Sequence, residues 1–200
     1  MKDWVGNSNS IIKMLGASNH CDEEREPLDF YATSPDAIDH LLKKVDLPRQ
    51  ILEPACGSGC LSKRLEELGH DVYSSDIEDR GYGIKQDFFS MDKPPFDGDF
   101  AIVTNPPYRY SLEFCKHSLE LVPEGSLVCM FLKTLFLEGK KRYKELFVTT
   151  PPHRVLQFVE RALCAKNGDF EKRRKEGTAV AYAWFVWVKG HNGPTILDWI

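Results

Sequence analysis

The 200-residue sequence lacks long apolar runs, and no stretch approaches the roughly 18 consecutive apolar residues that a membrane-spanning helix requires. Residues 1–20 also lack the continuous apolar core of a secretion signal. Internal repeats and low-complexity tracts are absent too, which argues against solenoid and fibrous architectures. We therefore expect a globular cytoplasmic protein without a membrane partner, and a single domain at this length.

The cysteines lack the spacing of a metal site. Cys56 and Cys60 are separated by three residues, and no second Cys/His pair completes a zinc site. No Cys-x-x-Cys pair occurs among the six cysteines, which are Cys21, Cys56, Cys60, Cys115, Cys129 and Cys164. We expect reduced, partly buried thiols and no bound metal.

An excess of positive charge is also lacking, since the formal net charge is −4 at pH 7. This argues against a nonspecific nucleic-acid binder that relies on its overall charge. A local basic face is still compatible with two short stretches, 140–144 and Lys172–Lys175. Runs of this kind are more often solvated surface.

Strand and helix patterns alternate along most of the chain. Residues 1–27 are polar, and we interpret them as a partly ordered N-terminal arm. Strands are predicted over 50–54, 71–76, 83–87, 100–104, 126–132, 154–159 and 180–188, and helices over 33–45, 61–68, 111–121 and 141–147. This alternation predicts an open, mostly parallel α/β sheet, in which ligands bind outside the carboxyl ends of the strands.

Several residues at predicted strand ends suit an adenosine-containing ligand. Gly57 and Gly59 follow the strand at 50–54, where glycines let the backbone turn sharply and a ligand approach closely. Ser62 replaces the third glycine of the dinucleotide pattern, which weakens a nicotinamide or flavin interpretation. Asp76 is placed to accept hydrogen bonds from ribose hydroxyls. Asp87 could accept from an adenine amino group, and Phe88, next to it, could pack on the ring.

Two motifs carry a family resemblance. Glu53-Pro54-Ala55-Cys56-Gly57-Ser58-Gly59 resembles the first motif of class I methyltransferases, whose loop holds the methionine end of S-adenosylmethionine. Tyr31-Ala32-Thr33-Ser34-Pro35 resembles the upstream motif of the amino-methylating DNA enzymes. The resemblance covers about residues 29–159 and implies a Rossmann-like fold with an antiparallel strand near the C-terminus and helices on both faces. It implies S-adenosylmethionine as cofactor, bound by Tyr31, Thr33, Glu53, Pro54, Ala55, Gly57, Gly59, Asp76, Ile77, Asp87, Phe88 and Asn105.

The segment Asn105-Pro106-Pro107-Tyr108 follows the predicted strand at 100–104. Its two prolines stiffen the turn and leave carbonyl groups fixed in direction. The Asn105 side-chain oxygen and the Pro106 carbonyl are suited to accept both N–H groups of a planar amine. These acceptors would localise its lone pair and stabilise the positive charge that develops during methyl transfer. Tyr108 offers a flat face for a substrate ring, worth about 1–3 kcal/mol per base.

This tetrapeptide resembles that of N6-adenine DNA methyltransferases, which implies catalytic roles for Asn105, Pro106, Pro107 and Tyr108. About 40 residues follow position 160, so we expect 28–200 to form one catalytic domain without a large target-recognition domain. Compact adenine methyltransferases of bacteriophages and prophages are similar in this respect and have counterparts of 182–187. The basic run Lys172–Lys175 and the strand at 180–188 would then have to supply substrate contacts. Trp184 and Trp187, however, face opposite sides of a strand, as core residues do.

The expected reaction is therefore methylation of adenine N6 in DNA. Enzymes that methylate a glutamine amide in protein carry the same tetrapeptide, and so do some RNA-base methyltransferases, so these substrates stay open. A further alternative is a binding module without turnover, or a subunit that needs a partner or a second copy for target recognition. An intact Asn105 argues against loss of turnover.

Overall fold

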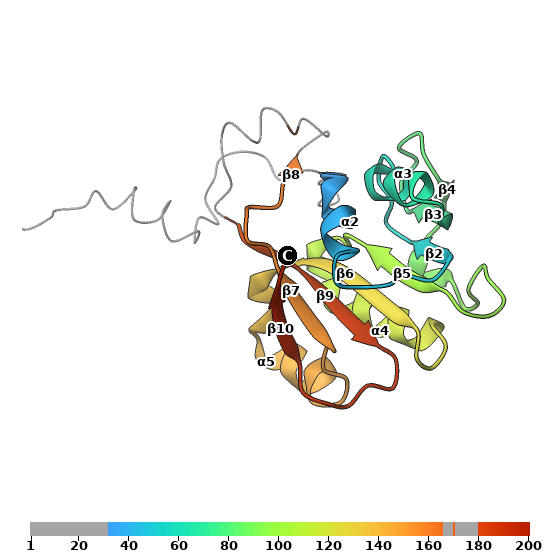
Figure 1. The fold of residues 1–200 in the computed structure, drawn as a ribbon. Helices are drawn as coiled ribbons and strands as arrows, with labels where there is room; N and C mark the ends of the chain where they lie inside the picture. Colours follow the sequence, from blue (N-terminus) through green and yellow to red (C-terminus); the bar gives the residue numbers. More distant parts are fainter. Residues whose placement is uncertain (1–31, 166–169, 171–179) are drawn as a thin grey trace, which may run out of the picture.

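The computed structural model describes residues 32–165, 170 and 180–200. The predicted arm at 1–27, Tyr31 and the basic run Lys172–Lys175 lie outside the described residues. Within them, eight strands form one open sheet in the order β10-β7-β9-β6-β5-β2-β3-β4 (Figure 1). Their bounds are β2 Gln50–Glu53, β3 Asp71–Asp76, β4 Ile84–Lys85, β5 Ala101–Thr104, β6 Leu127–Lys133, β7 Arg154–Gln157, β9 Tyr182–Val188 and β10 Ile196–Trp199.

The strand directions confirm the predicted sheet type. β9 pairs antiparallel with both of its neighbours, β6 and β7. The other adjacent pairs in the described sheet are parallel. The carboxyl ends of β2, β3, β5 and β6 therefore lie at one edge, together with Tyr182 at the start of β9, whose register partner is Lys133.

Helices cover both faces of the sheet, as predicted (Figure 1). α2 (Asp36–Leu41) and α3 (Cys60–Glu67) pack on one apolar layer, and α4 (Ser111–Leu121) packs on the other. Short helical segments complete the described elements: η2 Phe88–Ser90, η3 Tyr108–Tyr110, η4 Thr134–Leu137, α5 Lys140–Arg142 and η5 Tyr143–Phe147. The predicted helix over 141–147 is thus a short α-helical turn followed by a π-helical one.

The helix predicted over 33–45 is wrong in its extent. Thr33 belongs instead to β1 (Ala32–Thr33), which pairs antiparallel with β8 (Cys164–Ala165). At the other end, the α-helix stops at Leu41 and the chain continues as a tighter turn, in which Lys44 N donates to Leu41 O at 3.0 Å in an i→i−3 bond. The β1–β8 pairing joins segments far apart in sequence, which helical periodicity alone does not reveal.

Side chains of β9 alternate between the two apolar layers. Trp184 faces the layer under α2 and α3, whereas Trp187 faces the layer under α4, and neither is exposed. The indole of Trp184 donates to Ala37 O at 2.9 Å, and that of Trp187 donates to Thr150 O at 3.0 Å. β9 is therefore a central core strand, and only its first residue, Tyr182, reaches the carboxyl edge. The suggestion that the strand at 180–188 supplies substrate contacts does not hold for its interior, 183–187, which is buried.

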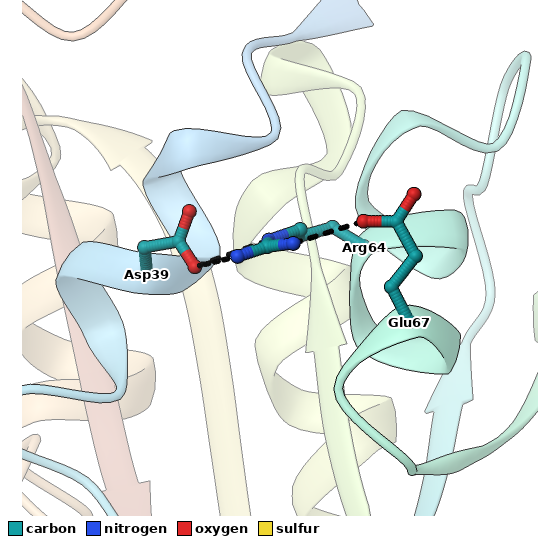
Figure 2. A network of polar contacts seen from close by, with 3 residues as sticks. All are labelled: Asp39, Arg64 and Glu67. Carbon is teal, nitrogen blue, oxygen red and sulfur yellow. Dashed lines mark hydrogen bonds and ion pairs between the residues drawn. The ribbon is translucent and has the colours of Figure 1, made fainter.

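An ion-pair network joins α2 to α3 (Figure 2). Arg64 donates to Asp39 Oδ1 at 2.7 Å and to Glu67 Oε2 at 2.9 Å. The Arg64 side chain is 31% exposed and both partners are more exposed, so solvent screens these ion pairs and neither adds much to stability. β1 precedes α2 and the glycine loop precedes α3, so the network joins the two helices that follow these segments in the sequence.

The basic stretch at 140–144 is partly engaged in contacts within the protein. Lys141 Nζ pairs with Glu113 Oε1 of α4 at 3.0 Å. The guanidinium of Arg142 donates to Glu138 O and lies 5.2 Å from the centre of the Phe136 ring. These contacts attach the segment to its neighbours, so it is more than a solvated charge run. None of the helices in the described ranges is long and apolar enough to cross a membrane.

Candidate active site at the carboxyl edge of the sheet

A cavity of about 400 Å³ opens at the carboxyl ends of β2, β3 and β5. Its volume lies within the range of about 300–1,000 Å³ that is typical of ligand pockets. The predicted site residues that line it are Thr33, Glu53, Pro54, Ala55, Gly57, Asp76, Ile77, Asp87, Phe88, Asn105 and Pro107. Gly59, Pro106 and Tyr108 are not among its lining residues.

The glycine loop between β2 and α3 is held in place from two sides. Gly57, with φ of 55°, donates its N–H to Asp76 Oδ2 at 2.9 Å, which ties the loop to the end of β3. Gly59 has φ of 80°, and a Cβ added there would lie 2.3 Å from the Tyr82 ring. The backbone conformation at 59 and the neighbouring Tyr82 ring thus each require a glycine there.

Glu53 is a buried acid at the base of the cavity. It is 2% exposed, and the Ser62 hydroxyl donates to its Oε2. Ser62 also contacts the Ser74 hydroxyl at 2.6 Å. Burial raises the pKa of Glu53 to about 8, although the Ser62 hydrogen bond opposes the rise. The serine that replaces the third glycine of the dinucleotide pattern therefore has a structural role, as the partner of Glu53.

Asp76 lies between the glycine loop and the cavity. Besides Gly57, it accepts a hydrogen bond from Glu78 N at 3.0 Å through Oδ1. A carboxylate has about four acceptor positions, so both oxygens can accept further bonds from a ligand. Asp76 lines the cavity, as predicted, but it also has a part in shaping the loop.

Both aromatic residues that follow Asp87 line the cavity, and they differ in their exposure. Phe88 is 2% exposed and packs against Phe114 and His117, with ring centroids 5.0 Å and 4.7 Å away. Phe89 also lines the cavity and is 41% exposed. Asp87 is exposed and caps the η2 turn by accepting from Phe89 N at 3.0 Å. Phe89 is consequently better placed than Phe88 to pack on a ligand ring.

Asn105 borders the cavity and Tyr108 lies beyond it. The Asn105 amide donates from Nδ2 to Thr33 Oγ1 at 2.8 Å. Tyr108 packs over the ends of β6 and β9, with its ring centre 4.5 Å from Lys133 Nζ and 6.0 Å from the Tyr182 ring. Its hydroxyl lies 3.8 Å from Cys164 Sγ, and burial raises the pKa of Tyr108 well above its usual value.

Sequence reasoning missed several residues of this edge. Arg109 and Tyr110 follow the tetrapeptide directly and line the cavity, so their position beside it was a usable signal. Tyr82 and Cys164 gave no such signal, because their contacts with Gly59 and Tyr108 depend on long-range packing.

No group of three or more His, Cys, Asp or Glu side chains within the described part of the chain could hold a metal ion. The described cysteines are free, and four of these five are buried.

Comparison with solved protein structures identifies the class of the fold. No family model and no curated protein sequence matches the chain. A structure described as a class I S-adenosylmethionine-dependent methyltransferase, from Listeria monocytogenes, aligns with 96% of this chain and 71% of its own at a TM-score of 0.57 and 11% identity. The fold is that of the class I methyltransferases.

Two further solved structures are similar to this chain. A type I restriction-modification methyltransferase subunit from Streptococcus thermophilus gives a TM-score of 0.56 at 14% identity, over 82% of this chain and 46% of that one. A structure described as an RNA methyltransferase, from Pyrococcus horikoshii, gives a TM-score of 0.51 at 12% identity, over 92% of this chain and 99% of that one. The chain thus spans about half of the restriction-modification subunit. At these identities the likeness concerns the fold.

Proposed function

We propose that this chain transfers a methyl group from S-adenosylmethionine to the N6 amine of adenine in DNA. The observation that carries the proposal is the position of Asn105 and Pro107. They follow β5 and line the same cavity as the glycine loop and Asp76. A methyl donor in that cavity and an amine held by Asn105 would therefore be neighbours.

The cavity residues fit the cofactor by their chemistry. The carboxylates of Asp76 and Asp87 can accept from ribose hydroxyls and an adenine amino group, and Phe89 can pack on the adenine ring. Gly57, which also lines the cavity, leaves room for the amino-acid end. Bound there, S-adenosylmethionine supplies an electrophilic methyl group on its sulfonium.

The tetrapeptide residues act on the amine that receives the methyl group. The Asn105 Oδ1 and the Pro106 carbonyl would accept its two N–H groups and localise the nitrogen lone pair. The same fixed dipoles stabilise the positive charge that forms on nitrogen, and this kind of effect is worth about 10²–10³ in rate per group. Tyr108, just beyond the cavity, would stack on the adenine ring once the Lys133 ammonium has moved off the Tyr108 ring. The adenine must leave a duplex to reach the site.

The similarity to a restriction-modification methyltransferase subunit supports a nucleic-acid substrate. This chain spans about half of that subunit, and its net charge is −4. We propose that 28–200 form a single catalytic domain and that a partner subunit or a second copy contributes to the choice of target.

The test offers tritiated cofactor to the full chain with DNA, RNA and protein side by side, followed by digestion and identification of the labelled product. We expect N6-methyladenine from DNA. Asn105→Ala should lower the transfer rate by about 10²–10³ because one acceptor is lost. Its cofactor affinity, measured by calorimetry, should stay within a few-fold of wild type.

Asn192→Ala is the matched control, because Asn192 is an exposed asparagine in the turn between β9 and β10. It should leave both measurements unchanged. Label in RNA or in a glutamine side chain would replace the proposed substrate. Full transfer by Asn105→Ala would refute the proposed mechanism.

A further inference from the structure

Thr33, the last residue of β1, and Asn105, which directly follows β5, meet through their side chains. Asn105 Nδ2 donates to Thr33 Oγ1 at 2.8 Å, across 72 positions of sequence. The resemblance to known enzymes implies that Thr33 contacts the cofactor. The structure shows a contact of a different kind, directed at the asparagine of the tetrapeptide.

Thr33 is held firmly enough to orient a partner. It is 3% exposed and pairs with Cys164 in the β1–β8 ladder, while the next residue, Ser34, donates its N–H to Leu163 O at 3.0 Å. A hydroxyl oxygen carries two acceptor lone pairs, so Thr33 Oγ1 can accept from Asn105 Nδ2.

An amide presents an acceptor on one side and donors on the other, so a bond to one side sets the direction of both. Were the Asn105 amide turned over, Nδ2 would face the substrate amine, and two donors would oppose each other. We propose that Thr33 is a positioning residue for methyl transfer, because its hydroxyl turns the Asn105 amide so that Oδ1 faces the substrate nitrogen. This rests on the proposed function.

The test replaces Thr33 by Val, which keeps the branched shape suited to β1 and removes the hydroxyl. We expect kcat to fall about tenfold, which corresponds to about 1.4 kcal/mol, with KM and cofactor affinity within twofold of wild type. Thr33→Ser, which restores the hydroxyl, should recover most of kcat. Thr195→Val is the control, because Thr195 donates to Pro152 O at 2.7 Å outside the cavity lining.

A second measurement does not depend on turnover. The side-chain amide protons of Asn105, assigned by their loss in Asn105→Ala, should exchange slowly with solvent in wild type and Thr33→Ser and faster in Thr33→Val. If the wild type methylates nothing, the proposed function fails and this exchange measurement alone decides the orienting contact. Unchanged exchange and kcat in Thr33→Val would overturn the proposal. A loss of cofactor affinity at unchanged kcat would assign Thr33 to the cofactor instead.

Discussion

At the carboxyl edge of the sheet, the position of a residue follows from its local sequence, whereas its burial and hydrogen bonds depend on residues distant in the sequence. The sequence placed Glu53 beside the cavity, and the structure agrees. Its burial and its bond from Ser62 could not be predicted, because they require the end of β2 to pack under α3 and β3. In the same way, Phe88 and Phe89 are equivalent in sequence, and only the η2 turn decides which of them is buried.

The raised pKa of Glu53 predicts a pH-dependent stability. The folded protein keeps a proton up to about pH 8, whereas the unfolded chain releases it near 4.5. The free energy of unfolding should therefore fall as pH rises from about 4.5 to 8, because the unfolded state then binds fewer protons. Glu53→Gln cannot titrate, so its stability relative to wild type should increase from pH 5 to pH 8 in urea denaturation.

Glu160→Gln, at an exposed position, controls for the loss of one carboxyl and should show no such trend. An equal difference between Glu53→Gln and wild type at both pH values would contradict the burial argument.

At the scale of elements, local sequence patterns predicted strands and helices best where the residues that determine the element all lie within one short stretch. The strand, glycine loop and helix from β2 to α3 are such a case, and so is α4 at 111–121. The prediction of a helix over 33–45 was wrong at its start, because β1 pairs with β8, about 130 residues later in the sequence. The glycine loop itself was predicted, but the packing of the Tyr82 ring over Gly59, which covers the loop, was not.

That cover gives a prediction for Gly59→Ala. Both this change and Gly81→Ala place a side chain at a left-handed φ, 80° and 77°, which costs about 1–3 kcal/mol. A Cβ at Gly81 meets nothing within 4 Å, whereas one at Gly59 meets the Tyr82 ring at 2.3 Å. Gly59→Ala should thus destabilise by about 1 kcal/mol or more beyond Gly81→Ala in denaturant titrations, an overpacking cost.

Adding Tyr82→Ala to Gly59→Ala should recover that excess, measured against Tyr82→Ala alone. Equal losses in Gly59→Ala and Gly81→Ala would mean that the ring moves aside at little cost.

At the scale of the whole molecule, β9 joins the two apolar layers and the two halves of the sheet. It contacts β6 on one side and β7 on the other, and its two tryptophans anchor opposite faces. The composition of 180–188 predicted a strand, and the family resemblance predicted an antiparallel one. Its position between β6 and β7 could not be derived from periodicity, which carries no information on strand order.

The two tryptophans should differ in their effect on stability. Trp184→Phe leaves a small cavity and removes one of the hydrogen bonds to the carbonyl of Ala37, a residue only 2% exposed, so we expect a loss of about 2–4 kcal/mol. Trp187→Phe should cost less, because Thr150 is partly exposed and water can reach its carbonyl. Urea titrations of both variants compare the losses, and a larger loss for Trp187→Phe would contradict this assignment.

The place of β9 also sets an order for assembly during translation. β7 pairs with β9 and β10 in the described sheet, and both of these strands are synthesised after it. A nascent chain that ends before residue 182 therefore contains β7 without a partner and β6 with an open edge. The parallel strands β2, β3, β5 and β6 can pair with one another much earlier, because all four are synthesised before β7. The described sheet is thus completed only when β10 (Ile196–Trp199) has been made.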